Sequence, residues 1–145
     1  MNARRGSVLA FAAAVMGIAF LVLRQALFAT HPLGIAVQVL AFALMVWARV
    51  TFGRRSFHAA ADPTAGGLVT HGPYRYWRHP IYAAILYFVW AGVPSHLSLE
   101  AVAAAGLVTL GLVTRMLLEE RLLRREYPGY EVYARQTRRV IPFVA

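Results

Sequence analysis

Two clusters of polar and aromatic side chains stand out in an otherwise apolar sequence. The first runs from Gly66 to Tyr82 and reads Gly-Gly-Leu-Val-Thr-His-Gly-Pro-Tyr-Arg-Tyr-Trp-Arg-His-Pro-Ile-Tyr. Its glycines permit tight turns and a close approach of the backbone to a ligand. Its aromatic rings offer stacking surfaces, and Arg78 and His79 supply hydrogen-bond donors. This composition favours a segment that binds a small molecule.

The second cluster is Arg115-Met-Leu-Leu-Glu119-Glu120. Arg115 and Glu119 are four residues apart, so on a helix they share one face. A carboxylate there can hold an amine or ribose hydroxyls, and an arginine can clamp a carboxylate or a phosphate. The simpler alternative is an ion pair on the helix surface, worth about 0.2–0.5 kcal/mol. Taken alone, Arg78 could likewise be an interfacial anchor, and His79 an ordinary helix-entry residue.

Several other kinds of chemistry lack the residues that they need. The sequence contains no cysteine, which excludes disulfides, a thiol nucleophile and a cysteine-ligated metal. His31, His58 and His96 lack the spacing of metal ligands, so no metal site is expected. No Ser-His-acid arrangement and no phosphate-binding P-loop is visible in the sequence.

The elements that position both clusters are apolar enough to lie in lipid. Apolar residues make up 59% of the 145, only 14% are charged, and the mean hydropathy is +0.55. A soluble domain of this size could not hide so much apolar surface from water. Four stretches approach the roughly 20 apolar residues that a helix needs to cross a bilayer. They cover residues 8–28, 33–50, 80–97 and 99–118.

The links between these stretches predict a single all-α membrane domain over residues 1–145. Short links join the first two helices and the last two, which predicts two antiparallel helical hairpins. The long loop 53–79 separates them, and loops of that length are usually functional or disordered. Pro94 is expected to kink or end the third helix. The tail 119–145 predicts a helix leaving the membrane, a turn at Tyr127-Pro-Gly129 and a short surface helix.

The distribution of charge predicts the orientation. The net charge is +9, and all fifteen basic residues are arginine. Nearly all of them lie in the N-terminus, the long loop and the tail, whereas the links near residues 29–32 and 94–98 have none. Basic residues placed between apolar segments are typical of loops that face the cytoplasm and anionic lipid head groups. Both termini and the long loop are therefore expected in the cytoplasm, and this placement argues against nucleic acid as a partner.

The order and spacing of the polar motifs resemble one enzyme family. The chain is similar to isoprenylcysteine carboxyl methyltransferases and their bacterial phospholipid-methyltransferase-like relatives over roughly residues 66–143. Four strings carry the resemblance: Gly72-Pro-Tyr-Arg-Tyr-Trp-Arg-His-Pro-Ile-Tyr82, Arg115…Glu119-Glu120-Arg-Leu-Leu, Tyr127-Pro-Gly-Tyr130-Glu-Val-Tyr133 and Arg139-Val-Ile141-Pro142. The first two predicted helices support the resemblance only through their topology.

The resemblance implies an S-adenosylmethionine-dependent methyltransferase in a bacterial-type inner membrane, with the cofactor bound on the cytosolic side. The acceptor would be a hydrophobic or lipid-linked carboxylate or amine. Arg115 would orient a carboxylate, and with an amine acceptor Glu120 is the candidate base that takes its proton. The residues expected to contact the cofactor are Gly66, Gly67, Leu68, Val69, Tyr74, His79, Pro80, Tyr82 and Glu119.

Two positions depart from the family pattern. Ala84 replaces the glycine that the family has two residues after the motif tyrosine, and Thr137 stands where valine is usual. Neither departure removes a polar contact. A prenylated cysteine, a phospholipid amine, a quinone-like lipid and an isoprenoid acid are all consistent acceptors.

Two other functions remain open on the sequence. Sterol-reductase-like membrane proteins, which use NADPH, have a similar Arg-His-Pro…Tyr half, but asparagine typically follows Arg-His-Pro where Ile81 stands here. A non-catalytic membrane subunit could also keep the motif for folding. The joint presence of Tyr74, His79, Arg115 and Glu119 argues against such a loss of activity.

Overall fold

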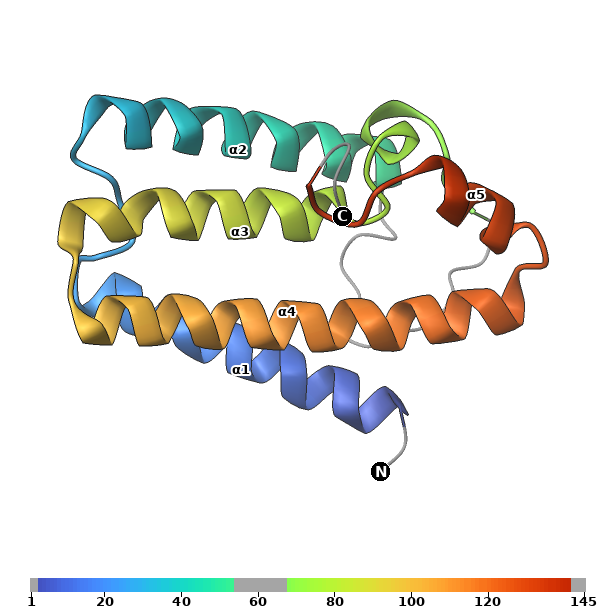
Figure 1. Ribbon diagram of the computed structural model, residues 1–145, viewed down its shortest axis with the longest axis horizontal. Helices are drawn as coiled ribbons and strands as arrows, with labels where there is room; N and C mark the ends of the chain where they lie inside the picture. The colour runs from blue at the N-terminus through green and yellow to red at the C-terminus, as the bar shows by residue number, and fades with distance from the viewer. Residues whose placement is uncertain (1–2, 54–67, 142–145) are drawn as a thin grey trace.

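The chain folds into helices joined by short links, as expected of an all-α protein. The computed structural model describes residues 3–53 and 68–141, and these ranges contain no β-strand beyond one isolated bridge between Trp77 and Arg138. Figure 1 shows the order of the elements. These are α1 (Ala3–Leu23), α2 (Pro32–Phe52), the 3₁₀ helix η2 (Gly72–Arg75), α3 (Pro80–Gly92), the 3₁₀ helix η3 (Val93–His96), α4 (Leu99–Glu126) and α5 (Tyr130–Gln136).

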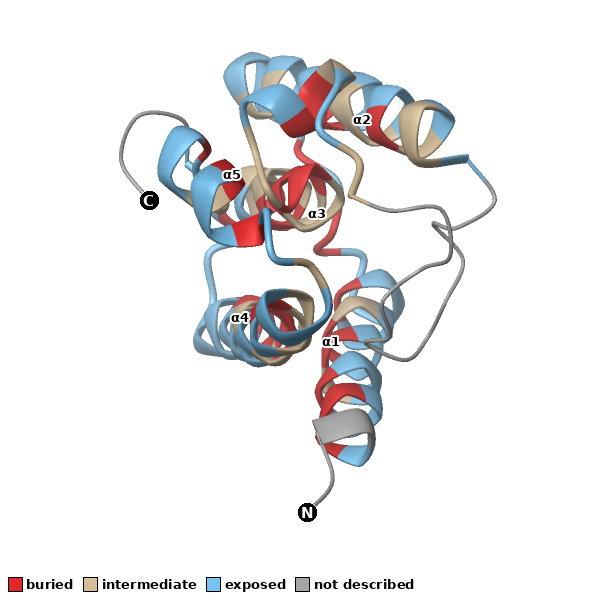
Figure 2. Cartoon of the chain, turned by 90° about the vertical axis from the view of Figure 1, so that its right-hand side faces the viewer, coloured by how far each residue is buried: buried red, intermediate tan, exposed pale blue. Residues whose placement is uncertain are grey.

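The long helices pack in two pairs, and neither pair is joined by one of the short links. The short links do join antiparallel helices, but α1 packs along α4, and α2 packs along α3 (Figure 2). Small residues allow the close approach of α1 to α4. A Cβ atom added at Gly111 would lie 2.5 Å from the carbonyl oxygen of Ala10, and one at Gly17 would lie 2.9 Å from that of Ala104. Close contact of backbones across small residues is a common packing mode of membrane helices.

The first helix ends earlier than its apolar pattern predicts. It begins at Ala3 instead of residue 8 and stops at Leu23 instead of residue 28, so both expected boundaries were wrong. Gln25 takes a left-handed φ of 52°, and the amide of Ala26 donates to the carbonyl of Leu21 at 2.8 Å. Ala26, Leu27 and Ala29 of the link that follows are apolar and buried, so hydropathy does not mark the end of the helix.

A buried glutamine fastens that turn to the rest of the bundle. The side chain of Gln38, in α2, donates to the carbonyls of Leu27 at 2.8 Å and Phe88 at 3.0 Å, and it accepts from the amide of Ala29 at 2.9 Å. Gln38 is buried, and a buried polar side chain without partners would be costly. Gln38 therefore joins the link after α1 to both α2 and α3.

The other boundaries agree closely with the sequence. The α-helical part of α3 ends at Gly92, and Pro94 lies in the 3₁₀ turn that follows, as the proline predicts. α4 continues to Glu126, and after a turn α5 begins at Tyr130, which confirms the expected tail.

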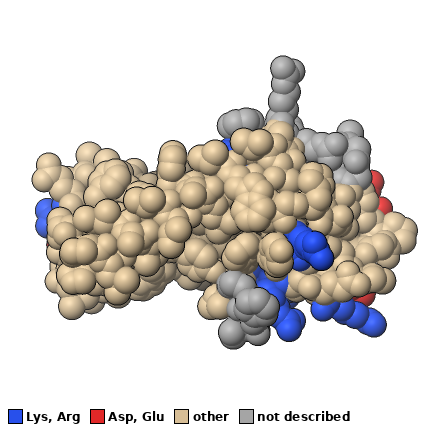
Figure 3. Space-filling view, turned by 90° about the horizontal axis from the view of Figure 1, so that it is seen from above, with Lys and Arg blue, Asp and Glu red and all other residues tan. Residues whose placement is uncertain are grey.

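Three helices of the described part are long and apolar enough to cross a membrane. They are Arg5–Leu23, Pro32–Phe52 and Leu99–Glu126. α3 has only 13 residues, so by length alone it does not confirm the fourth span that the sequence predicts. Figure 3 shows an uncharged surface over most of the molecule, with most charges gathered at the end that carries α5. This distribution agrees with a protein embedded in lipid with one highly charged end.

Two glycines test the close packing of α3 against the turn after α1. A Cβ atom added at Gly92 would lie 2.1 Å from the carbonyl oxygen of Leu27, whereas one at Gly106 in α4 would meet nothing within 4 Å. We expect Gly92→Ala to lower the free energy of unfolding by about 1–3 kcal/mol, because the backbone must shift. Gly106→Ala should be neutral or stabilising by up to about 1 kcal/mol, through helix propensity. Thermal unfolding in detergent, followed by tryptophan fluorescence, measures both, and equal midpoints would contradict this packing.

Candidate functional site

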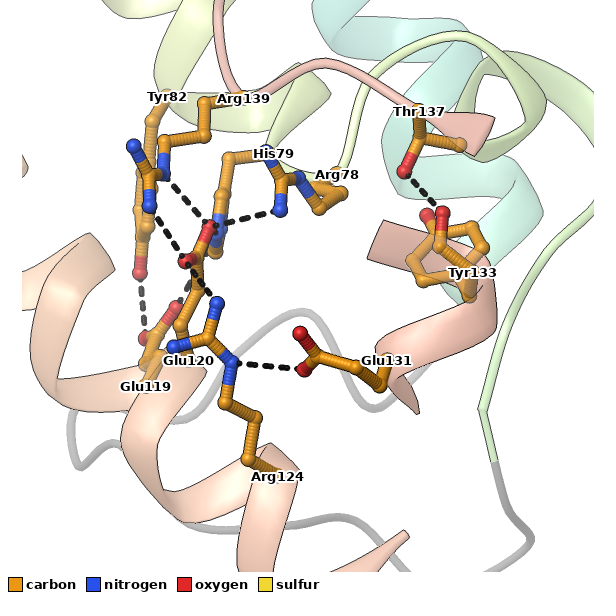
Figure 4. A network of polar contacts seen from close by, with 10 residues as sticks. All are labelled: Arg78, His79, Tyr82, Glu119, Glu120, Arg124, Glu131, Tyr133, Thr137 and Arg139. Atoms are coloured by element: carbon orange, nitrogen blue, oxygen red, sulfur yellow. Dashed lines mark hydrogen bonds and ion pairs between the residues drawn. The ribbon is translucent and has the colours of Figure 1, made fainter. Parts of the chain in front are cut away.

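The start of α3 and the later turns of α4 bring the two polar clusters together. His79 precedes α3, and Pro80 occupies its first position, where the missing amide hydrogen costs nothing. Tyr82 follows within the first turn. Figure 4 shows the side chains of His79 and Tyr82 directed at Glu119 and Glu120 of α4. Residues about forty positions apart in the sequence thus form one site.

A short hydrogen-bonded chain joins Tyr82 to both charged residues of the second cluster. The Tyr82 hydroxyl donates to Glu119 Oε1 at 2.6 Å and accepts from Arg115 Nε at 2.5 Å. Arg115 Nε also lies 3.0 Å from Glu119 Oε1. Arg115 is only 3% exposed, so this is not the solvated ion pair of a helix surface. The three groups fix each other's orientation at the boundary between α3 and α4.

His79 lies between the two glutamates. Its Nδ1 is 3.7 Å from Glu119 Oε2, and its Nε2 is 3.4 Å from Glu120 Oε1. The imidazole ring stacks on the ring of Tyr82, with centroids 5.6 Å apart and planes inclined by 11°. The structure therefore brings together five of the residues singled out in the sequence: His79, Tyr82, Arg115, Glu119 and Glu120.

Glu120 is a fully buried carboxylate surrounded by cationic groups. Arg139 binds both of its oxygens, with Nε at 3.1 Å from Oε1 and a terminal nitrogen at 3.1 Å from Oε2. Arg78 lies 3.7 Å and Arg124 3.9 Å from the same carboxylate. The hydrogen bond with Glu120, together with its charge, raises the pKa of Arg139. A carboxylate bound in this way is a weak base, so its contacts favour an anchoring role.

The C-terminal tail pairs with the segment just before α3. The amides of Arg78 and His79 donate to the carbonyls of Arg138 at 2.6 Å and Arg139 at 3.2 Å, and the amide of Arg138 donates to Tyr76 at 3.1 Å. The sequence motifs included Arg139 but assigned it no contact. In the sequence, the available signal for this contact was Glu120 at the end of an apolar stretch, with several arginines after it. The tail thus holds the backbone that presents His79.

Tyrosines complete the support behind this segment. The ring of Tyr74 stacks on Phe52 at the end of α2, with centroids 5.3 Å apart, and its carbonyl accepts from the Tyr133 hydroxyl at 2.7 Å. Thr137, which departs from the family pattern, uses its hydroxyl to donate to the carbonyl of Tyr133 at 2.8 Å. Burial, then the charge of Glu120, raises the pKa of Tyr130 to about 12. These side chains therefore remain neutral hydrogen-bonding groups near the site.

The structure describes only some of the other residues that are predicted to contact the cofactor. Leu68 and Val69 are partly buried just before η2, and Pro80 is buried. Gly66 and Gly67 lie outside the described residues. No three metal-ligating side chains come together in the described part of the chain.

Three consecutive residues present polar atoms that suit a small polar ligand. Trp77 Nε1, Arg78 Nε and His79 Nε2 are buried and make no well-directed hydrogen bond within the described structure, although His79 Nε2 lies 3.4 Å from Glu120 Oε1. Buried polar groups are normally satisfied, so orphaned ones need a reason. Beside them stand the carboxylates of Glu119 and Glu120. Donors and acceptors together suit a ligand that carries both hydrogen-bond donors and acceptors.

The comparison with known families agrees with this site. The family model described as phospholipid methyltransferase matches residues 29–129, which include α2, α3 and α4 and most of the polar residues above. No curated protein and no solved structure matches the chain. Because the match extends over well more than half of its length, the chain belongs to the phospholipid methyltransferase family.

Proposed function

We propose that this protein transfers a methyl group from S-adenosylmethionine to a lipid acceptor at the cytoplasmic face of the membrane. The observation that supports it best is the buried cluster of His79, Tyr82, Arg115 and Glu119, formed where α3 meets α4 within the matched region. Membership of the phospholipid methyltransferase family supports methyl transfer as the reaction. The identity of the donor and acceptor, and the role of each residue, are proposed from the geometry.

The cofactor would lie against the segment before α3. S-adenosylmethionine supplies, when bound, a methyl group on a positively charged sulfonium. Glu119 would accept hydrogen bonds from hydroxyl or amine groups of the cofactor, and the buried indole nitrogen of Trp77 would donate to it. The other contacts that we propose, through backbone or ring surfaces, are Gly66, Gly67, Leu68, Val69, Tyr74, Pro80 and Tyr82.

The acceptor would lie on the Arg115 side of the site. Arg115 is held by Tyr82 and Glu119, which fixes the guanidinium so that it can orient a carboxylate or phosphate. Methyl transfer from a sulfonium is an in-line displacement, so its catalysis rests mainly on positioning. Burial of these groups also keeps water away from the reacting atoms. For an amine acceptor Glu120 was the candidate base, but its bidentate contact with Arg139 favours the anchoring role instead.

The proposed topology has four crossings with both termini in the cytoplasm. α3 and η3 together have 17 residues and extend about 27 Å, close to the roughly 30 Å of a hydrocarbon core. Four crossings place the N-terminus, the 53–79 loop and α5 on one side. The arginines of those regions then face the cytoplasm, as expected in a bacterial-type inner membrane.

Calorimetry with purified protein in detergent tests the cofactor and the two charged roles. We expect S-adenosylhomocysteine to bind and NADPH not to bind. Glu119→Ala should weaken S-adenosylhomocysteine at least about ten-fold, because charge-assisted hydrogen bonds are lost. Arg115→Ala should retain binding but lose methylation of the acceptor.

Three results would contradict these assignments. Binding of NADPH alone would favour a reductase over a methyltransferase, and binding of neither ligand would favour a non-catalytic membrane subunit. Equal loss of S-adenosylhomocysteine binding in both variants would contradict the separate roles of Glu119 and Arg115. Glu131→Gln is a matched control, because Glu131 is exposed on α5 and pairs only with Arg124 among the contacts of the described residues.

Labelling of single cysteines tests the topology directly, because the chain has no cysteine of its own. We expect a membrane-impermeant maleimide to label Leu97→Cys from the outer side of intact cells. His71→Cys and Arg125→Cys, which are also exposed, should react only after permeabilisation. Labelling of positions 71 and 125 from opposite sides would rule out a shared pocket.

The role of Glu120 as an anchor of the tail predicts a large effect on stability. Glu120→Gln should cost about 1–3 kcal/mol, since it weakens the charge-assisted hydrogen bonds to Arg139 and removes the counter-charge beside the largely buried Arg78. Glu131→Gln should cost less than about 1 kcal/mol, because that pair is exposed. Thermal unfolding measures the difference. Trypsin should also cleave after Arg139 faster in Glu120→Gln, and an unchanged cleavage rate would show that Glu120 does not hold the tail.

A further inference from the structure

The guanidinium of Arg115 lies between two aromatic rings from different helices. Its central carbon is 5.0 Å from the ring centroid of Phe11, in α1, and 6.0 Å from that of Tyr82, in α3. Stacking on aromatic faces is a favoured environment for arginine. α1 lies entirely before the region matched by the family model, residues 29–129. The chain therefore adds a wall to the site from outside the family region.

Phe11 connects that wall to the lipid. Its side chain belongs to a residue that is 37% exposed, while Arg115 beneath it is 3% exposed. Val8 and Val15, three residues before and four residues after Phe11, share its helix face and are also exposed and apolar, so this face of α1 would contact acyl chains in a membrane. Phe11 is thus a single ring with one side at the lipid surface and the other on a buried cation.

A buried polar residue, Ser7, lies on the same face of α1 as Phe11. Ser7 is four residues before Phe11, so the two share a helix face, and Ser7 is fully buried. Its hydroxyl has no hydrogen-bond partner within the described structure. A hydroxyl buried and unsatisfied is uncommon, and its position one turn from Phe11 indicates a place where a polar group of a ligand could be received.

We propose that α1 forms the lipid-side wall of the acceptor site, and that Phe11 determines which membrane lipids reach Arg115. The occupant would be a lipid whose head group carries an anionic phosphate or carboxylate. Its anionic oxygens would bind the edge of the guanidinium, where the N–H groups lie, while the face of the guanidinium stays on the rings. Its hydrocarbon chain would pack beside Phe11. This inference rests on the proposed methyl transfer and adds the acceptor's route and class.

Binding measurements on purified protein in detergent test this inference. The probes are dioctanoylphosphatidylethanolamine, which carries a phosphate, N-acetyl-S-farnesylcysteine, which carries a carboxylate, and dioctanoylglycerol, which carries no anion. The variants are Phe11→Ala and Phe11→Tyr, which retains the ring. Phe20→Ala is a matched control, because Phe20 is 40% exposed on the same helix and lies two and a half turns further along. S-adenosylhomocysteine binding is measured on every variant.

We expect at least one anionic probe to bind more tightly than dioctanoylglycerol. The probe that binds shows whether the acceptor's anionic group is a phosphate or a carboxylate. Phe11→Ala should weaken that probe about ten-fold while changing S-adenosylhomocysteine affinity by less than about two-fold. Phe11→Tyr and Phe20→Ala should resemble the unmodified protein in both measurements.

Four outcomes of the probe measurements would overturn the inference. These are unchanged probe binding in Phe11→Ala, equal loss in Phe20→Ala, equally tight binding of dioctanoylglycerol, and binding of neither anionic probe by a protein that binds S-adenosylhomocysteine. Loss of S-adenosylhomocysteine binding in Phe11→Ala would also overturn it, because Phe11 would then support the whole site instead of selecting the acceptor. Failure of the unmodified protein to bind S-adenosylhomocysteine would instead contradict the proposed methyl transfer itself.

Discussion

The buried carboxylate of Glu120 is the interaction on which the arrangement of the site depends. Two oxygens inside the protein accept from Arg139 of the tail, and Arg78 and Arg124 lie near them. Desolvating these charges is costly, and the cost is offset only while each one keeps its partners. The tail, the segment before α3 and the end of α4 must therefore assemble together. That assembly places His79, which the backbone of the tail also holds, against Glu119.

The pairing of the helices explains why the site lies where it does. α1 with α4 and α2 with α3 form two close pairs, and the polar chain from Tyr82 to Arg115 and Glu119 crosses the boundary between α3 and α4. In the proposed reaction, a methyl donor soluble in water and an acceptor soluble in lipid would meet in one place. The charged end of the bundle would offer this meeting place, because Arg115 contacts both Tyr82 of α3 and the half-exposed Phe11 of α1.

Local sequence determined much of this protein, because some physical requirements are local. Apolar stretches that are long enough to cross a bilayer predicted the helices. Pro80 marked the start of α3, and Pro94 marked its end. The four-residue spacing placed Arg115 and Glu119 on one helix face, where they do interact. The motif order was sufficient to indicate the family. Gly66 and Gly67, at the start of the predicted cofactor segment, lie outside the described residues, so that part stays a prediction.

Only the tertiary structure decided which distant groups meet. Hydropathy could not show that α1 ends at Leu23, because buried apolar residues such as Ala26 and Leu27 follow in the link. Nor could it show that α1 packs on α4, since the choice depends on how closely small residues such as Gly17 and Gly111 let two backbones approach. Glu120 resembled a free carboxylate until Arg139 was seen to bind it, and Phe11 resembled an ordinary lipid-facing residue. A side chain's type and spacing are encoded locally, whereas its partners depend on how the whole chain packs.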